Sequence, residues 1–290
     1  MLLYKPGIVT AIVVAGALSR EISVETAHDA IDQENWEAAA AKAMNLISKL
    51  NLTEKASLVT GTANGNCIGN LAPIDRVDFG GLRLSDGPQG LHLADMASVF
   101  PLGLTVAATW DRELIARRGA AMGAKFRDKS ANVMLGPSTG PLGRSSWEGF
   151  SPDTYLSGVA MQATIRSAQA VGVQACAKHF IGNEQETHRT NSQVDGVDVA
   201  AASANIDDRT LHELYLWPFA DAVKAGVSSF MCSYNRVNMT YSCANEPILN
   251  QILRDELGFK GYMMSDWFST HSGAKDINAG LDLNMPGFTS

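Results

Sequence analysis

Basic runs, long apolar segments and repeats are all missing from this sequence, and these absences narrow the classes of function. Its 290 residues carry 23 Lys and Arg against 30 Asp and Glu, a net charge of −7, with no run of basic residues. Nucleic acids and acidic membrane surfaces are therefore poor partners. The apolar stretch at residues 8–15 is too short to span a membrane as a helix. The sequence contains no internal repeat and no low-complexity segment.

Cysteine is scarce, with only four residues in the chain. No spacing of Cys and His resembles a zinc site, so no metal ion is expected. Cys232 and Cys243 bracket one apparent strand and loop, and they could form a disulfide in a secreted protein. Cys67 and Cys176 have no obvious partner, and the apolar run around Cys176 predicts a buried position for it.

Phosphate-binding motifs are also absent, which bears on the fold class. Neither G-x-G-x-x-G nor G-x-x-x-x-G-K-[ST] occurs, although an open doubly wound sheet would want a glycine-rich turn after its first strand. Short apolar strands alternate instead with amphipathic helices, and polar residues follow the strands. This pattern predicts an α/β fold of the TIM-barrel type, (β/α)8. Little sequence follows Pro286, so we expect the barrel to be incomplete at its C-terminal end.

The expected elements follow from the apolar pattern. Strands are expected at residues 82–85, 100–107, 132–135, 173–177, 227–231, 261–264 and 281–283. Helices are expected at residues 36–50, after an N-cap at Thr53, after residue 111, around 156–163, from Thr210 with an interruption at Pro218, and around 249–257. The helix after residue 111 carries one apolar stripe, formed by Ile115, Gly119, Met122 and Phe126.

The first residues are typical of a secretory signal peptide. Lys5 precedes the apolar stretch, and AGA at 15–17 fits a small-x-small cleavage site. A first β-strand is the alternative for this stretch, but a signal peptide is favoured. We therefore expect residues 1–17 to be a leader, residues 18–290 to be one domain, and the protein to be secreted. The triplets NLT (51–53) and NMT (238–240) match N-glycosylation sites, although such triplets are common by chance.

Charged and hydroxyl-bearing side chains gather at the expected carboxyl ends of the strands. They are Asp86, Arg144, Lys178, His179, Tyr234, Asp266 and Trp267. Such groups with one aromatic ring suit a polyhydroxylated ligand. Asp266 beside Trp267 is arranged like the nucleophile of a retaining glycosidase, whose partner carboxyl lies about 5–5.5 Å away. Two alternatives remain, a helix N-cap role for Asp266 and a Schiff base on Lys178.

Six motifs in this sequence resemble glycoside hydrolase family 3, and its fungal β-glucosidases in particular. They are SDGP (85–88), WEGFSPD (147–153), KHFIGNEQE (178–186), LHELY (211–215), MCSYN (231–235) and GYMMSDW (261–267). The resemblance covers about residues 36–286. It implies a barrel-like N-terminal domain that holds a glucosyl unit of a small oligosaccharide or glucoside, with no metal or cofactor.

The resemblance also implies roles for the matching residues. Asp266 would be the nucleophile that forms the glycosyl-enzyme, and Trp267 would line the glucosyl subsite. The other residues implied to bind the sugar or to support its site are Asp86, Arg144, Lys178, His179, Arg189, Met231 and Tyr234. Neighbouring cations would keep the nucleophile ionised.

The sequence departs from the family pattern at three positions around the site. His92 follows the SDGP motif where the family has an arginine, and it lacks arginine's fork of donors. A shortened loop has serines at 145–146 in place of a further arginine, for which Arg144 is the available substitute. Arg83 stands where the fungal enzymes usually have a cysteine, which offers a reason for the unpaired Cys67.

A fourth departure concerns the general acid/base, which two-domain members carry as a glutamate on a second domain. No glutamate here matches it, and Glu148, Glu184 and Glu186 are expected to pair with nearby cations. We therefore expect a truncated chain, with the missing C-terminal domain as its partner and with little activity alone, since general acid catalysis contributes about 10²–10⁴-fold. The expected reaction is retaining hydrolysis of terminal β-D-glucosyl residues from cello-oligosaccharides or aryl glucosides. A β-xylosidase or exo-glucanase, and a non-catalytic sugar-binding relic, remain alternatives.

Overall fold

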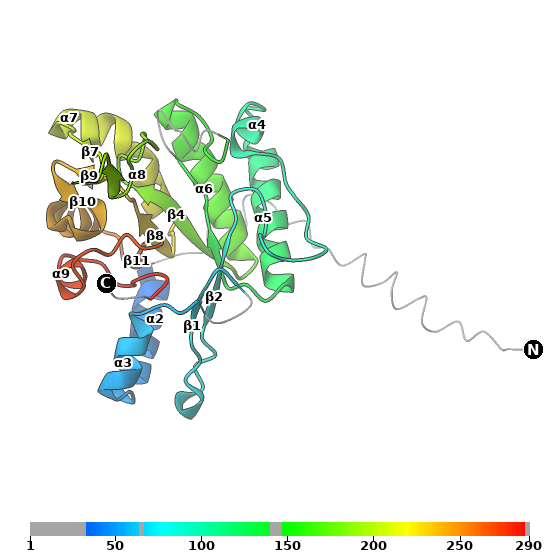
Figure 1. Ribbon diagram of the computed structural model, residues 1–290. Coiled ribbons are helices and arrows are strands. Elements are labelled where there is room, and N and C mark those ends of the chain that lie inside the picture. The colour runs from blue at the N-terminus through cyan, green and yellow to red at the C-terminus, as the bar shows by residue number, and fades with distance from the viewer. Residues whose placement is uncertain (1–32, 64–66, 140–146, 288–290) are drawn as a thin grey trace, which may run out of the picture.

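A six-stranded sheet organises the structure. The computed structural model describes residues 33–63, 67–139 and 147–287, so the expected leader at residues 1–17 lies outside the described residues. The strand order is β1-β2-β3-β4-β8-β11 (Figure 1). The strands are β1 (Gly69–Leu71), β2 (Leu82–Asp86), β3 (Val133–Leu135), β4 (Gln174–Phe180), β8 (Ser229–Cys232) and β11 (Tyr262–Ser265). Neighbouring strands pair in parallel except β1 and β2, which are antiparallel.

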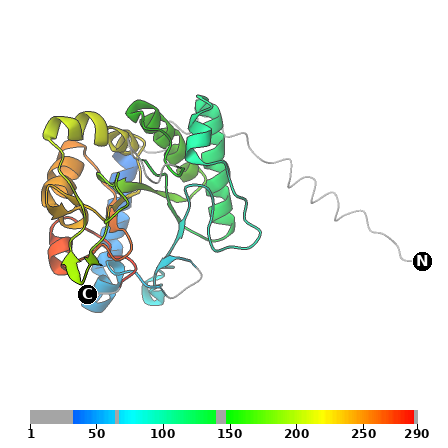
Figure 2. The ribbon, with the colours of Figure 1, turned by 45° about the horizontal axis from the view of Figure 1, so that its top comes forward.

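Single backbone bridges link the two edges of this sheet. Leu283 bridges to β11, Asn284 bridges to Thr60, and Thr62 bridges to β1. Short segments of chain thus lie between the edge strands, and the sheet is curled (Figure 2). The predicted α/β class is confirmed. The described residues do not form the predicted ring of parallel strands, because β1 is antiparallel and residues 281–283 contribute a bridge instead of a strand.

Three helices pack on the outer face of the curled sheet (Figure 1). They are α5 (Arg112–Asp128), α6 (Thr154–Ala170) and α8 (Trp217–Lys224). The N-cap of α5 is Asp111, whose Oδ1 accepts a hydrogen bond from the Leu114 backbone N–H at 3.0 Å. The predicted stripe on α5 is confirmed, because all four of its residues are buried. Among the described helices, none has both the length and the apolar character needed to cross a membrane.

The two N-terminal helices are α2 (Gln33–Ser48) and α3 (Leu52–Leu58). The predicted cap at Thr53 is wrong, because Thr53 lies inside α3. Asn51 is the N-cap: its Oδ1 accepts from the Glu54 backbone N–H at 2.9 Å, and Glu54 Oε2 accepts from the Asn51 backbone N–H at 2.9 Å. This reciprocal pair of hydrogen bonds satisfies two backbone N–H donors at once, and a cap at Thr53 would not satisfy both.

The strand predicted at residues 100–107 is also wrong. This segment contains the short helix α4 (Gly103–Ala107), with Val106 and Ala107 buried. Periodicity alone does not distinguish a short buried strand from a buried helical turn. Tertiary packing decides the outcome, since a Cβ on Gly103 would come within 2.3 Å of the Glu148 carbonyl oxygen. The glycine allows the segment that carries Glu148 to pack against α4.

The chain between β4 and β8 contains more elements than the single helix predicted from Thr210. Residues 182–207 include a short antiparallel hairpin of β5 (Ser192–Val194) and β6 (Val197–Val199). Pro218 does not interrupt a long helix, because it lies in the first turn of α8, where a missing N–H costs nothing.

The remaining elements are mostly short. They are η2 (Asp75–Val77), β7 (Ser203–Ala204), α7 (Asp208–Thr210), the π-helix η3 (Leu211–Tyr215), β9 (Arg236–Val237), β10 (Thr240–Tyr241), η4 (Ser242–Ala244), the π-helix η5 (Pro247–Glu256) and α9 (Ala274–Asn278).

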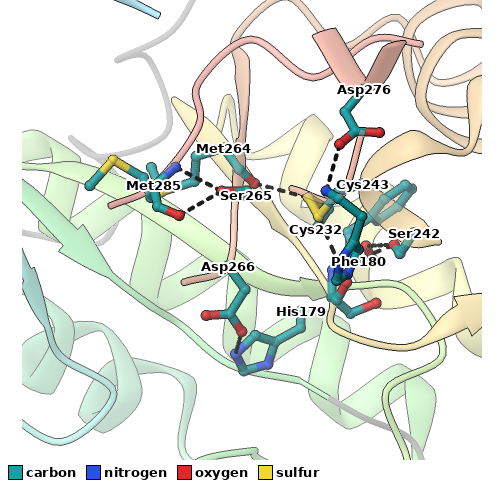
Figure 3. The surroundings of a disulfide bond; sticks show 12 residues. His179, Phe180, Cys232, Ser242, Cys243, Met264, Ser265, Asp266, Asp276 and Met285 are labelled. Carbon is teal, nitrogen blue, oxygen red and sulfur yellow. Dashed lines mark hydrogen bonds and ion pairs between the residues drawn. A yellow bond between two sulfur atoms is a disulfide. The ribbon is translucent and has the colours of Figure 1, made fainter. Parts of the chain in front are cut away.

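One disulfide connects the end of β8 to η4. Cys232 and Cys243 form it, as the sequence predicts (Figure 3). Both sulfur atoms are buried, and Cys232 lies beside β11 in the sheet register. Cys67 and Cys176 are free, and Cys176 is fully buried as predicted. The disulfide therefore closes the base of the loop at residues 233–242, which carries Tyr234.

Candidate active site

The alternation of side chains along the strands builds one site inside the curled sheet. The sheet register places Lys178 of β4 beside Met231 of β8, and Met231 beside Met264 of β11. Side chains two residues apart on a strand share a face, so Asp266 follows Met264 on the inward face. Asp86 ends β2 in the same way. Charged groups from three strands thus meet at the carboxyl ends of the strands.

Asp266 is a buried carboxylate, with 7% of its surface exposed. Burial raises the pKa of Asp266 to about 6, while the Lys178 ammonium, the Trp267 backbone N–H, the Tyr234 hydroxyl and the Arg189 guanidinium oppose this rise. The Trp267 N–H donates to Asp266 Oδ1 at 2.7 Å. The helix N-cap alternative is excluded, because the next helix is α9, which begins eight residues later. The Asp266 carboxylate therefore does not serve as a helix cap.

His179 faces Asp266 across the site. Its Nε2 lies 3.4 Å from Asp266 Oδ2, and the two side chains point toward each other in Figure 3. Burial lowers the pKa of His179 well below its usual value, and the charges of Lys178 and Arg189 act in the same direction. The imidazole is therefore neutral at pH 7. It contributes a polar group beside the carboxylate without adding a positive charge.

Lys178 supplies the positive charge at the centre of the site. Its Nζ lies 3.4 Å from Asp86 Oδ1 and 4.0 Å from Glu148 Oε2, and 5% of its surface is exposed. Burial lowers the pKa of Lys178, but the carboxylates of Glu148, Asp86 and Asp266 outweigh this effect, and the pKa lies above its usual value. An ammonium held in this way is a poor Schiff-base nucleophile, which disfavours the aldolase alternative. The predicted pairing of Glu148 with a cation is confirmed.

Tyr234 and Arg189 complete the surroundings of the carboxylate. The Arg189 guanidinium lies over the Tyr234 ring, 4.4 Å from its centroid, and Arg189 Nη1 lies 2.8 Å from Glu186 Oε2. Burial raises the pKa of the Tyr234 hydroxyl, and the charge of Asp266 and its hydrogen bond raise it further. The hydroxyl therefore stays protonated and donates to Asp266. The predicted pairing of Glu186 with a cation is also confirmed.

The remaining residues that the sequence assigned to the site, or near it, do not all contact Asp266. Trp267 is half-buried, and its ring packs over Gly69, where a Cβ would come within 2.8 Å of the ring. Met231 is 2% exposed and belongs to the apolar floor beneath the site. Arg144 lies outside the described residues. His92 is exposed on the loop after β2, and its backbone N–H donates to the Asp86 carbonyl.

The sequence argument missed Gly69 as a residue that shapes the site. A Cβ there would also come within 2.4 Å of Met285 Cε, so only glycine fits without repacking. Nothing local in the sequence signals this, because Gly69 and Trp267 are distant in the chain. Within residues 33–63, 67–139 and 147–287, no three His, Cys, Asp or Glu side chains gather so that they could hold a metal ion.

Several known proteins are similar to this chain in sequence. The chain is 55% identical over 262 residues to probable beta-glucosidase G of Aspergillus flavus, covering 87% of this chain and 32% of that protein. It is 51% identical over 284 residues to probable beta-glucosidase G of Emericella nidulans, covering 94% of this chain and 35% of that protein. The chain therefore spans about a third of the length of these relatives.

Solved structures and a family model agree with these relatives. A beta-glucosidase of Chaetomium thermophilum superposes with a TM-score of 0.83 at 51% identity, covering 88% of this chain and 31% of that chain. The model of the glycosyl hydrolase family 3 N-terminal domain matches residues 85–285, which contain every site residue described above except Gly69. The chain belongs to glycosyl hydrolase family 3.

Proposed function

We propose that this chain carries the glucosyl-binding site of a retaining β-glucosidase, with Asp266 as its nucleophile. The observation that supports this most directly is the buried Asp266 carboxylate at the end of β11, with His179, Tyr234 and Lys178 around it. The names of the relatives support a β-glucoside as substrate. We also propose that the curled sheet and its helices form the barrel-type domain that the sequence predicts.

The proposed mechanism follows from the charges in the site. An ionised Asp266 oxygen attacks the anomeric carbon, and the bond to the leaving oxygen breaks as that oxygen takes up a proton from solvent. Water then attacks the same carbon, loses a proton to solvent, and releases the sugar and the carboxylate. Lys178 favours the ionised form of Asp266, and the Tyr234 hydroxyl donates to it before attack. Attack thus requires the deprotonated form, which prevails above about pH 6.

The other polar residues are proposed to hold the sugar. Asp86 and Lys178 present an acceptor and a donor at the strand ends, and the neutral His179 ring lies beside them. Trp267 would stack on the sugar ring. Arg144 remains a proposed contact, as in the sequence prediction. Terminal β-D-glucosyl residues of cello-oligosaccharides or aryl glucosides are the proposed substrates.

The described carboxylates near Asp266 are engaged by cations. Asp86 and Glu148 face Lys178, and Glu186 faces Arg189. None of these three is therefore proposed as the general acid. We expect this chain alone to be slow on unactivated glycosides, since general acid catalysis contributes about 10²–10⁴-fold.

The test uses a reagent that needs little acid assistance. The protein is incubated with a 2-deoxy-2-fluoro-β-glucoside that carries a dinitrophenolate leaving group, and the intact mass and peptide map are recorded. The expected result is one glycosyl adduct on Asp266 in the parent chain and in the exposed control Asp255→Asn, and none in Asp266→Asn. A folded protein without an adduct, or an adduct on another residue, contradicts the proposal. The same assay with the matching xyloside separates a β-glucosidase from a β-xylosidase.

We also propose that the protein is secreted, as the sequence predicts. The Cys232–Cys243 disulfide supports this, because such bonds persist in oxidising compartments. Fusing residues 1–17 to a reporter protein tests the proposal. Export and cleavage after residue 17 are expected, and retention of the uncleaved reporter inside the cell contradicts it.

A further inference from the structure

A cavity lies behind β2, on the face opposite the candidate active site. Its volume is about 400 Å³, and its wall includes Arg83 and Ser85 of β2. These two residues alternate with Leu84 and Asp86, which face the interior of the curled sheet. The loop that carries His92 forms one side of this cavity, and Ser85 Oγ donates to the His92 carbonyl at 3.3 Å. One strand thus contributes to both sites with opposite faces.

Basic side chains dominate the polar wall of this cavity. Arg83, His92 and Lys129 line it, and no Asp or Glu does, although the chain as a whole carries a net charge of −7. Arg83 Nε donates to the Ser130 carbonyl, and Lys129 Nζ donates to the Asp95 carbonyl at 2.6 Å. These bonds orient both side chains, and each cation has further N–H groups besides the one that donates. Among the described residues, neither cation forms an ion pair with a carboxylate.

We propose that this cavity binds a small oxyanion such as phosphate or sulfate. An arginine fork and an ammonium on one concave surface provide charge-assisted donors for tetrahedral oxygens. The C-terminal end of α5 at Ser130 opposes an anion, and the bond from Arg83 to that carbonyl offsets part of its negative potential.

A purely structural role for Arg83 is the competing explanation. In that case Arg83 only satisfies the Ser130 carbonyl just after α5, and the cavity has no preference for anions. The two explanations differ in how the cavity responds to anions, and Cys67 can report that response because it also lines the cavity. A thiol in a cationic cavity senses both the local potential and the presence of a ligand.

Cys67 is a natural reporter for this cavity. It is half-exposed, whereas Cys176 is fully buried and the other two of the four cysteines form the disulfide. Burial raises the pKa of Cys67, and the charge of Arg83 opposes this rise. Alkylation of the folded chain should therefore modify Cys67 alone, and peptide mapping measures its rate.

The first experiment is protection by anions. Cys67 alkylation by iodoacetamide is timed in chloride, phosphate and sulfate at one ionic strength and one alkaline pH. Phosphate and sulfate are expected to slow it at least about threefold, as a bound dianion raises the thiol pKa by opposing the cations. Arg83→Gln should remove the protection, and Lys125→Gln, a change on α5 outside the cavity wall, should keep it. Equal protection in Arg83→Gln and the parent, or none in the parent, overturns the proposal.

The second experiment tests whether the cavity around Cys67 carries the positive potential that anion binding requires. The rates of Cys67 alkylation by iodoacetate and by iodoacetamide are compared as a ratio, which cancels changes in thiol pKa and in exposure. Losing one charge near the thiol should lower this ratio about threefold in Arg83→Gln. If Arg83→Gln fails to fold, Lys129→Gln should show the same loss. A ratio that does not change while the unfolding temperature falls supports only the structural role and overturns the proposal.

Discussion

Replacing Asp266 by asparagine should stabilise the protein at neutral pH. Burial raises the pKa of Asp266 from its ordinary value of 3.8 to about 6, so the folded state binds its proton more tightly than the unfolded state. The stability contributed by the protonated form is fully present below about pH 4 and is lost as pH rises through about 6. At about 1.4 kcal/mol for each pKa unit, the ionised carboxylate costs about 3 kcal/mol at pH 7. Asparagine removes this cost and keeps an oxygen for the Trp267 N–H.

The assay is urea unfolding of the parent chain and Asp266→Asn across the window of about pH 4 to pH 7.5. We expect the two free energies of unfolding to be similar near pH 4, and the variant to be more stable by about 3 kcal/mol near pH 7.5. The exposed control Asp255→Asn should stay close to the parent throughout. Both variants remove one acidic group, so a general effect of net charge would appear in both.

Two results would refute this reasoning. A variant less stable than the parent at pH 7.5 would mean that Lys178 and the surrounding donors fully compensate the burial of the charge. A stability difference that does not vary with pH would mean that Asp266 does not titrate in this window. Agreement would show that the site carries a stability cost because its proposed nucleophile must be both buried and ionised.

Three further predictions follow from the same geometry. The rate of glycosyl-adduct formation should rise with pH to a plateau above about 6, because Asp266 must be ionised, and a plateau already reached at about pH 5 would contradict its raised pKa. Gly69→Ala should displace the Trp267 ring, cost about 1–3 kcal/mol in urea unfolding and slow adduct formation, and an unchanged adduct rate would show that the ring position does not matter. Replacing Cys232 and Cys243 together by serine removes the cross-link across a sequence separation of 11 and should cost about 3 kcal/mol in thermal unfolding, and no change would show that packing alone holds the loop.

Part of the candidate site was predictable because its residues belong to local patterns. An apolar run that ends in Asp266 and Trp267 indicates a buried strand with a carboxylate at its carboxyl end, and β11 has this form. The same reasoning predicted β4 and placed Lys178 and His179 near its end. The spacing of Cys232 and Cys243 in an apparent strand and loop predicted their disulfide. Each inference needed only neighbouring residues.

Other features were decided by contacts between distant segments. Residues 100–107 form a helix because Gly103 admits the backbone of Glu148, and nothing within the segment shows this. Asn51 and Thr53 are both competent caps, and Glu54 favours Asn51 only when the reciprocal bond is considered. The antiparallel β1 and the bridges that link the sheet edges depend on pairings that a strand pattern does not specify.

The sequence by itself determined the α/β class, the family resemblance and the residue types of the site, because these depend on local pattern and on long motifs. Only the tertiary structure decided how these groups act on one another. It set Lys178 between Asp86 and Glu148, and it buried Asp266 beside a neutral His179. Burial and charge depend on distances between strands, and those distances arise only when the sheet curls and packs.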